Sequence, residues 1–187
     1  MLFHASRIPD LKTLTPHVSN HGTPLVYLSQ KRENVLVYLS NPVEKCCKDL
    51  GFAHNGPFYR MASYGFNKSG ILTLDEYYPN AAIDTYKGVK GYIYTVDESD
   101  TFKQMNDIPF AFTSDKPVET TDCEYIPDAY AAILHAAEQG KIVITKYENN
   151  TPAKLEWIEN IIKKEYEQSA DHSEYRFFLK TKFDFLR

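Results

Sequence analysis

The sequence predicts an α+β protein, and two observations lead to this class. Short runs of β-branched and aromatic residues are distributed along the whole chain and indicate strands. Helical patterns also occur, but they do not alternate regularly with the strands as a parallel βαβ architecture requires. The chain has 187 residues, of which 43% are hydrophobic and 25% charged, so it is long enough to bury the core of one ordinary domain.

Strands are predicted wherever a short apolar run is bounded by proline, glycine or polar residues. The first, at residues 1–6, ends near the Ile8-Pro9 step, because proline restricts the residue that precedes it. The clearest strand in the middle of the chain is Gly91–Val96, with the sequence GYIYTV. The other predicted strands lie at residues 25–28, 71–78 (running into a short acidic helix), 108–113, 123–126 and 142–147.

Helices are predicted from caps, prolines and the spacing of apolar residues. Ser29 is expected to cap a helix whose apolar positions are Val35, Leu36 and Leu39. Pro42 ends this helix and begins a second one that runs to about residue 51. The other predicted helical segments are a turn at 81–86, a helix from Pro127 closed by Gly140, a long helix begun by Thr151-Pro152, and a last helix over 172–187 with Tyr175, Phe178, Leu179 and Phe183 facing inward.

These elements predict a single domain over residues 1–187. Its core is expected at about residues 1–147, followed by a C-terminal helical extension at about residues 151–187. Aromatic residues are abundant, because 14 Tyr and 11 Phe bring the aromatic share to 14%. Tyrosine on this scale favours half-buried surfaces with a polar rim, which are typical of clefts and interfaces.

The composition disfavours several classes of protein. No stretch approaches the about 20 apolar residues that a membrane helix needs, so we expect no membrane partner. The net charge of −4 disfavours a dedicated nucleic-acid binder. Three cysteines, two of them adjacent, do not make a disulfide framework, and the first residues do not resemble a secretory signal. We therefore expect a reduced, cytoplasmic protein.

No metal site is expected. His17 and His21 are four residues apart, which would place both on one face of a helix as metal ligands. Their neighbours, which include Gly22 and Pro24, are typical of a loop, and no third ligand lies at a telling distance. Solvated loop histidines are the preferred interpretation.

The first thirty residues carry the sharpest functional signal. In the strand LFHAS, His4 and Ser6 occupy alternate positions, so their side chains point to the same face of the strand. After a loop of about twenty residues, a second strand places Tyr27 just before Ser29 and the predicted helix. The sequence contains no phosphate-binding loop, nucleophile elbow or zinc-protease motif.

These two blocks resemble the ADP-ribosyltransferase-like superfamily. LFHAS is similar to its first-strand histidine motif, in which a hydrophobic and an aromatic residue precede the histidine and a small residue and Ser or Thr follow it. LVYLSQKRENVLVYL is similar to its second block, a strand that ends in tyrosine before a small residue and a helix. The resemblance implies split or strongly bent, mixed or antiparallel sheets with flanking helices.

The resemblance also implies NAD as a co-substrate and no metal. By resemblance, His4 and Ser6 would bind the ribose end of NAD, and Tyr27 would stack on the nicotinamide ring. Ser29, the small residue of the second block, belongs to the same cofactor-binding set. These residue types suit the roles, because imidazole and hydroxyl groups bond to ribose hydroxyls and a tyrosine face stacks on a flat cationic ring.

A third motif residue of the superfamily is often a glutamate on a later strand, where it contacts the nicotinamide ribose. Glu124, on the predicted strand 123–126, takes this catalytic role by resemblance, and Glu119 is the alternative. Cleavage of the nicotinamide bond builds positive charge on the sugar, which a nearby carboxylate stabilises. Without such a carboxylate, the same cleft would bind a nucleotide and not transfer ADP-ribose.

Three functions are consistent with these residues. The first is an NAD- or nucleotide-binding ADP-ribosyltransferase-like protein that transfers ADP-ribose to an unknown protein or nucleic-acid acceptor, or hydrolyses NAD. The second is a non-catalytic interaction module that retains the fold. The third is an enzyme that acts on RNA ends, which requires a basic groove. A carboxylate facing a cleft between His4 and Tyr27 distinguishes the first function from the second.

Overall fold

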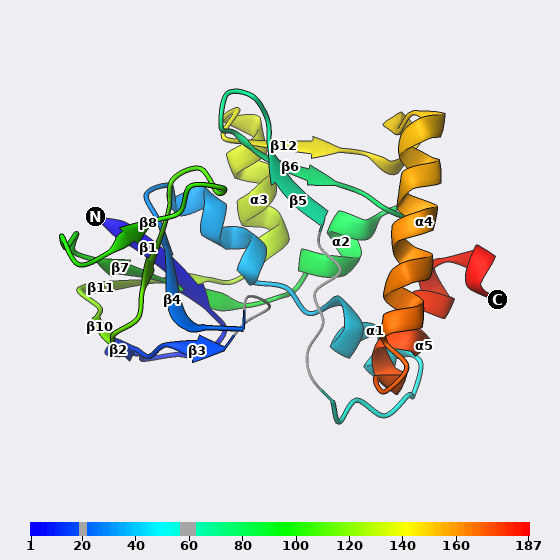
Figure 1. Ribbon diagram of the computed structural model, residues 1–187, viewed down its shortest axis with the longest axis horizontal. Helices are drawn as coiled ribbons and strands as arrows, with labels where there is room; N and C mark the ends of the chain where they lie inside the picture. Colours follow the sequence, from blue (N-terminus) through cyan, green and yellow to red (C-terminus); the bar gives the residue numbers. More distant parts are fainter. Residues whose placement is uncertain (19–21, 57–62) are drawn as a thin grey trace. The chain divides into compact units, whose positions relative to one another are not determined.

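The computed structural model describes residues 1–18, 22–56 and 63–187. The chain forms two compact units, each assembled from three separate stretches, and Figure 1 labels their α-helices and most of their strands. Unit 1 comprises Met1–Leu39, Gly65–Thr73 and Gly88–Val143, and unit 2 comprises Ser40–Tyr64, Leu74–Lys87 and Ile144–Arg187. The predicted α+β class is confirmed.

Unit 1 is built on a large sheet with the strand order β11-β7-β1-β4-β9-β8. Its described strand pairs are antiparallel. A short strand, β3, also pairs with β4, and β2 and β10 form a separate two-stranded ribbon. The strands are β1 (Leu2–Ser6), β2 (Thr13–Leu14), β3 (His17–Val18), β4 (Pro24–Ser29), β7 (Gly91–Val96), β8 (Lys103–Gln104), β9 (Ala111–Ser114), β10 (Val118–Glu119) and β11 (Asp122–Ile126).

The two faces of this sheet have different coverings. On one face, side chains from β1, β4 and β7 form a core cluster with the β2–β10 ribbon, made of Leu2, Leu14, Val26, Leu28, Tyr94, Val96 and Val118. We call this side the ribbon face. On the other side, which carries the buried residues Ala5 and Ile93, lie the 3-10 helix η1 (Arg32–Tyr38) and the helix α3 (Ala129–Glu138). Figure 1 shows η1 and α3 beside each other, and we call this side the helix face.

Gly91 allows the helix face to pack closely against the sheet. A Cβ atom at this position would lie 2.4 Å from Cδ2 of Leu39 and 3.0 Å from the carbonyl oxygen of Ser6. Both distances are shorter than van der Waals contact, so a larger residue would displace the Leu39 side chain, which is fully buried.

Unit 2 is mostly helical. Its elements are α1 (Pro42–Asp49), α2 (Ala81–Tyr86), η2 (Tyr147–Asn149), α4 (Pro152–Gln168), α5 (Ser173–Lys182) and η3 (Asp184–Leu186). They enclose one cluster of buried residues, Val43, Cys46, Cys47, Tyr78, Ala81, Ile158, Ile162, Tyr175, Phe178, Leu179 and Phe183. The C-terminal helices therefore share a core with residues near 43–47 and 78–81, whereas the sequence presents them as an extension of a separate core.

Three further strands, β5 (Ser63–Phe66), β6 (Leu72–Asp75) and β12 (Ile142–Thr145), form a sheet in the order β12-β6-β5. The chain passes from one unit to the other within each of them. No helix in the described part of the chain is both long enough and apolar enough to cross a membrane.

Several local predictions are confirmed. The strand Gly91–Val96 has the predicted bounds. Thr151 caps α4 by accepting a hydrogen bond from the Lys154 amide, and Gly140 has a φ of 71° just after α3. The four residues predicted to face inward in the last helix, Tyr175, Phe178, Leu179 and Phe183, are all buried.

Two predictions about helices are wrong. Ser29 is not a helix cap, because it is the last residue of β4 and its Oγ accepts a hydrogen bond from the Lys31 amide. The following helix begins at Arg32 as a 3-10 helix, after an extended Lys31. No helix follows β6 directly, because Glu76 is held by other bonds: its amide donates to the Thr145 carbonyl.

Candidate functional site

His4 lies on β1 at a position where its ring bonds to the neighbouring strand. Nδ1 of His4 is 2.9 Å from the carbonyl oxygen of Tyr27 on β4. A carbonyl oxygen only accepts, so the proton of the imidazole is on Nδ1 and Nε2 is a hydrogen-bond acceptor. None of the hydrogen bonds among the described residues involves Nε2, so Nε2 is the ring atom that can accept from a ligand hydroxyl.

The surroundings of His4 favour the neutral form of its imidazole. Burial is the main cause, because it lowers the pKa of His4 from its usual value near 6.5; the Tyr27 carbonyl raises this pKa, and His17 lowers it further. A neutral ring keeps the acceptor at Nε2 and the donor at Nδ1.

This lowered pKa predicts a pH effect on stability. The unfolded chain binds a proton at His4 more readily than the folded chain, so the contribution of His4 falls as the pH drops below about 6.5. We expect acidification from pH 7.5 to 5.5 to destabilise the wild-type protein more than His4→Gln in urea unfolding. His135→Gln, which changes an exposed histidine, serves as the control, and an equal acid response of the wild type and His4→Gln would contradict the prediction.

Ser6 lies on the same face of β1 as His4 and ends the strand. Its Oγ accepts a hydrogen bond from the Ile8 amide at 3.1 Å, which leaves the hydroxyl proton free to donate. The two residues thus present an acceptor and a donor about 7 Å apart along the strand.

The ring of Tyr27 lies on the opposite face of the sheet from His4. Val26 and Leu28, its neighbours on β4, belong to the ribbon-face core together with Leu2. Because side chains alternate along a strand, His4 lies on the ribbon face with Leu2, whereas Tyr27 lies on the helix face. The structure therefore brings the main chain of Tyr27 to His4, but not its ring.

Ser29 is also on the helix face. The register pairs it with Phe3, and residues directly opposite each other in a ladder project to the same side. Ser29 is buried, and its bond from the Lys31 amide holds the turn between β4 and η1.

Glu124 lies on β11, where the register places it opposite Ile93 on the helix face. Its carboxylate accepts two hydrogen bonds from Arg32, from Nε at 2.7 Å and from Nη2 at 2.6 Å. These bonds raise the pKa of Arg32. The carboxylate predicted to face the cleft is therefore engaged by a guanidinium on the other side of the sheet from His4.

Glu119, the alternative carboxylate, lies on β10 opposite Thr13 of β2. Its Oε1 accepts a hydrogen bond from the Thr13 hydroxyl at 2.8 Å. This contact ties together the two strands of the ribbon.

The residues that lie beside His4 and Ser6 in the structure are not among the predicted site residues. The antiparallel register aligns Ser6, Tyr92 and Tyr125 across β1, β7 and β11, and it aligns His4 with Tyr94 in the next row. Tyr92 and Tyr94 alternate within GYIYTV, and this alternation was the available signal. Nothing in the sequence shows that β7 lies between β1 and β11.

The five residues predicted to bind NAD lie on both faces of the large sheet. His4 and Ser6 fit ribose hydroxyls, but Tyr27, Ser29 and Glu124 project from the other face of the same sheet. The five residues therefore do not surround one ligand. Among the described residues, no three His, Cys, Asp or Glu side chains are arranged to hold a metal ion; His21 lies outside the described residues.

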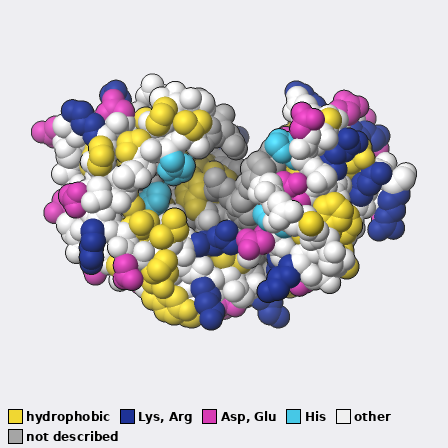
Figure 2. Space-filling model, turned by 90° about the horizontal axis from the view of Figure 1, so that it is seen from below, with side chains coloured by type: hydrophobic (Ala, Val, Ile, Leu, Met, Phe, Trp, Pro, Cys, Tyr) yellow, Lys and Arg dark blue, Asp and Glu magenta, His cyan; other side chains and the backbone are white. Residues whose placement is uncertain are grey.

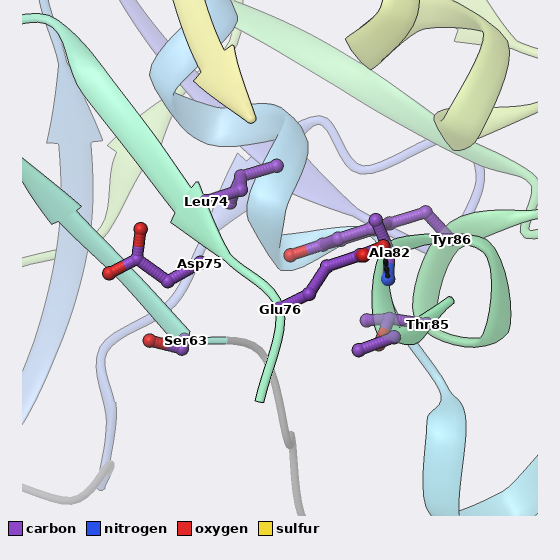
Figure 3. A pocket seen from close by; sticks show the side chains of 8 residues that line it. Ser63, Leu74, Asp75, Glu76, Ala82, Thr85 and Tyr86 are labelled. Carbon is purple, nitrogen blue, oxygen red and sulfur yellow. Dashed lines mark hydrogen bonds between the residues drawn. The ribbon is translucent and has the colours of Figure 1, made fainter. Parts of the chain in front are cut away.

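Unit 2 contains a shallow pocket, shown in Figure 3. Its most polar member, Glu76, is 2% exposed and accepts a hydrogen bond from the Ala82 amide. That bond, drawn as a dashed line, uses the carboxylate to support the chain, so we regard the pocket as structural. It is lined by Ser63, Leu74, Asp75, Glu76, Ala81, Ala82, Thr85 and Tyr86.

The structure is thus that of an α+β protein in which a histidine and a serine lie on the same face of an antiparallel sheet. Comparison with protein-family models, curated proteins and solved structures gives no match.

Proposed function

We propose that this protein is an ADP-ribosyltransferase-like protein that binds a nucleotide through His4 and Ser6 on the ribbon face of the large sheet. One observation carries the proposal: the bond from Nδ1 to the Tyr27 carbonyl orients the His4 ring and leaves Nε2 as an acceptor. A ribose offers adjacent hydroxyls that donate to such an acceptor and accept from the Ser6 hydroxyl.

Binding is proposed rather than transfer of ADP-ribose. Glu124, the carboxylate predicted to stabilise the transition state, accepts hydrogen bonds from Arg32 on the helix face. A developing positive charge on the ribbon face would therefore not meet it. His4 and Ser6 are suited to recognise the sugar, and Glu124 is not placed to assist cleavage of the nicotinamide bond.

The surface charge supports a small ligand over a long nucleic acid. Figure 2 shows lysine and arginine side chains interspersed with aspartate and glutamate over the face that it draws. With a net charge of −4, this mixture differs from the continuous basic groove that phosphate backbones require.

Isothermal titration calorimetry with NAD⁺ tests the proposal. His4→Asn keeps a donor for the Tyr27 carbonyl and removes the acceptor at Nε2, so we expect about tenfold weaker binding, the worth of one hydrogen bond. His135→Asn is the matched control on an exposed helical histidine. If the wild-type protein does not bind millimolar NAD⁺, the proposal is wrong and the interaction module becomes the better account.

A further inference from the structure

Tyr125 and Tyr92 form an aromatic surface beside Ser6 that the core does not explain. Their ring centroids are 5.4 Å apart with planes inclined by 46°. Tyr92 packs against the ribbon-face core, whereas Tyr125 is 50% exposed. An aromatic side chain that keeps half of its surface in water contributes little to the core, and its open face is available for stacking.

The segment that follows β1 packs against Tyr94 and leaves Tyr125 exposed. The hydroxyl of Tyr94 donates to the Ile8 carbonyl at 2.7 Å and accepts from the Leu11 amide at 3.2 Å. These bonds hold the segment after β1 against Tyr94, which is 1% exposed. Tyr125 lies on β11, which is an edge strand of the sheet among the described strands.

The register joins the aromatic surface to the proposed ribose contacts. Ser6 lies directly opposite Tyr92, and Tyr92 lies directly opposite Tyr125. Directly opposed residues in an antiparallel pair have Cβ atoms about 5 Å apart. The base of a ligand whose sugar meets Ser6 and His4 is therefore within reach of Tyr92 and Tyr125.

We infer that Tyr92 and Tyr125 are the stacking surface for the base of a purine nucleotide whose ribose is held by His4 and Ser6. This inference rests on the proposed function and adds the class of base and the residues that select it. The two rings are inclined to each other, so a planar base stacks on one of them and meets the other at an angle. A bicyclic purine is large enough to contact both rings, and therefore gains more contact than nicotinamide does.

Calorimetry with AMP and with nicotinamide mononucleotide tests this inference. We expect AMP to bind more tightly, and Tyr125→Leu to weaken AMP binding tenfold or more, because stacking of a base on an aromatic side chain has this size. Tyr125→Phe keeps the ring and is expected to bind AMP like the wild type. Tyr130→Leu, a tyrosine on α3, is the matched control.

The reactivity of Cys123 gives a second readout of binding. Cys123 is exposed, whereas Cys46 and Cys47 are buried. It lies two residues before Tyr125 and therefore on the same face of β11. We expect AMP to slow alkylation of Cys123 by iodoacetamide, measured by mass spectrometry, and expect Tyr125→Leu to reduce that protection.

The outcomes separate this inference from the proposed function. If His4→Asn weakens binding and Tyr125→Leu does not, the stacking surface is overturned and the ribose site stands. Loss of binding in Tyr27→Leu with normal binding in Tyr125→Leu also overturns it. If neither mononucleotide binds at millimolar concentration, both the inference and the proposed function are overturned. If a short single-stranded RNA binds much more tightly than AMP, the ligand is RNA and the inference of a free nucleotide is overturned.

Discussion

Replacing Glu76 by alanine is expected to lower the free energy of unfolding by about 3–5 kcal/mol, because two main-chain donors lose their acceptor and each unsatisfied buried polar group costs about 1–3 kcal/mol. Glu76 is 2% exposed, and its carboxylate accepts hydrogen bonds from the Ala82 amide at 3.1 Å and the Tyr147 amide at 3.3 Å. Nζ of Lys146 lies 3.4 Å from the same carboxylate. The variant leaves two main-chain donors without their acceptor in the interior of unit 2.

Urea unfolding followed by circular dichroism measures the effect. Glu148→Ala is the matched control, since it removes an exposed glutamate from the same turn and is expected to change stability by less than about 0.5 kcal/mol. Lys146→Met is expected to have an intermediate effect, because it removes the cation and keeps both amide bonds. Equal stability of Glu76→Ala and Glu148→Ala would show that the carboxylate does not hold unit 2 together.

Replacing Phe178 by alanine is expected to lower the free energy of unfolding by about 3–5 kcal/mol, the range for removal of a fully buried aromatic ring. Phe178 on α5 has no exposed surface. Its ring meets Tyr78 edge-on with centroids 6.2 Å apart and is parallel to Tyr175 with centroids 6.4 Å apart. The substitution opens a cavity where α5 packs against the rest of unit 2.

A comparison with an exposed phenylalanine isolates this cavity. Phe185 is 41% exposed, and Phe185→Ala is expected to cost less than about 1 kcal/mol in the same urea experiment. Phe178→Leu refills part of the space and is expected to fall between the two. A loss in Phe178→Ala no greater than in Phe185→Ala would contradict the assignment of this ring to the centre of the unit 2 core.

Much of the secondary structure follows from local chemistry. The alternation in GYIYTV predicts β7 with its correct bounds, and the Thr151-Pro152 pair predicts the start of α4. These signals are reliable because a cap bond or an alternating pattern involves residues only a few positions apart. The two-residue strands β2, β3, β8 and β10 escape prediction, because each exists only through its bonds to a distant partner.

The candidate site is predictable only in part. The spacing in LFHAS places His4 and Ser6 on one face of a strand, because side chains alternate whatever the neighbours are. Whether Tyr27 shares that face depends on the register between β1 and β4, which a single strand does not reveal. The bond between Arg32 and Glu124 joins residues 92 positions apart and depends on strand order in the same way.

The tyrosines also show which features follow from local sequence and which depend on the tertiary structure. The amino-acid sequence by itself determines the α+β class, the faces of individual strands and the chemistry available at His4 and Ser6. Short-range geometry sets all three. The tertiary structure decided that Tyr92 and Tyr125, rather than Tyr27, stand beside them. It also decided that Glu124 faces the other way, because strand order and register arise from packing of the whole chain.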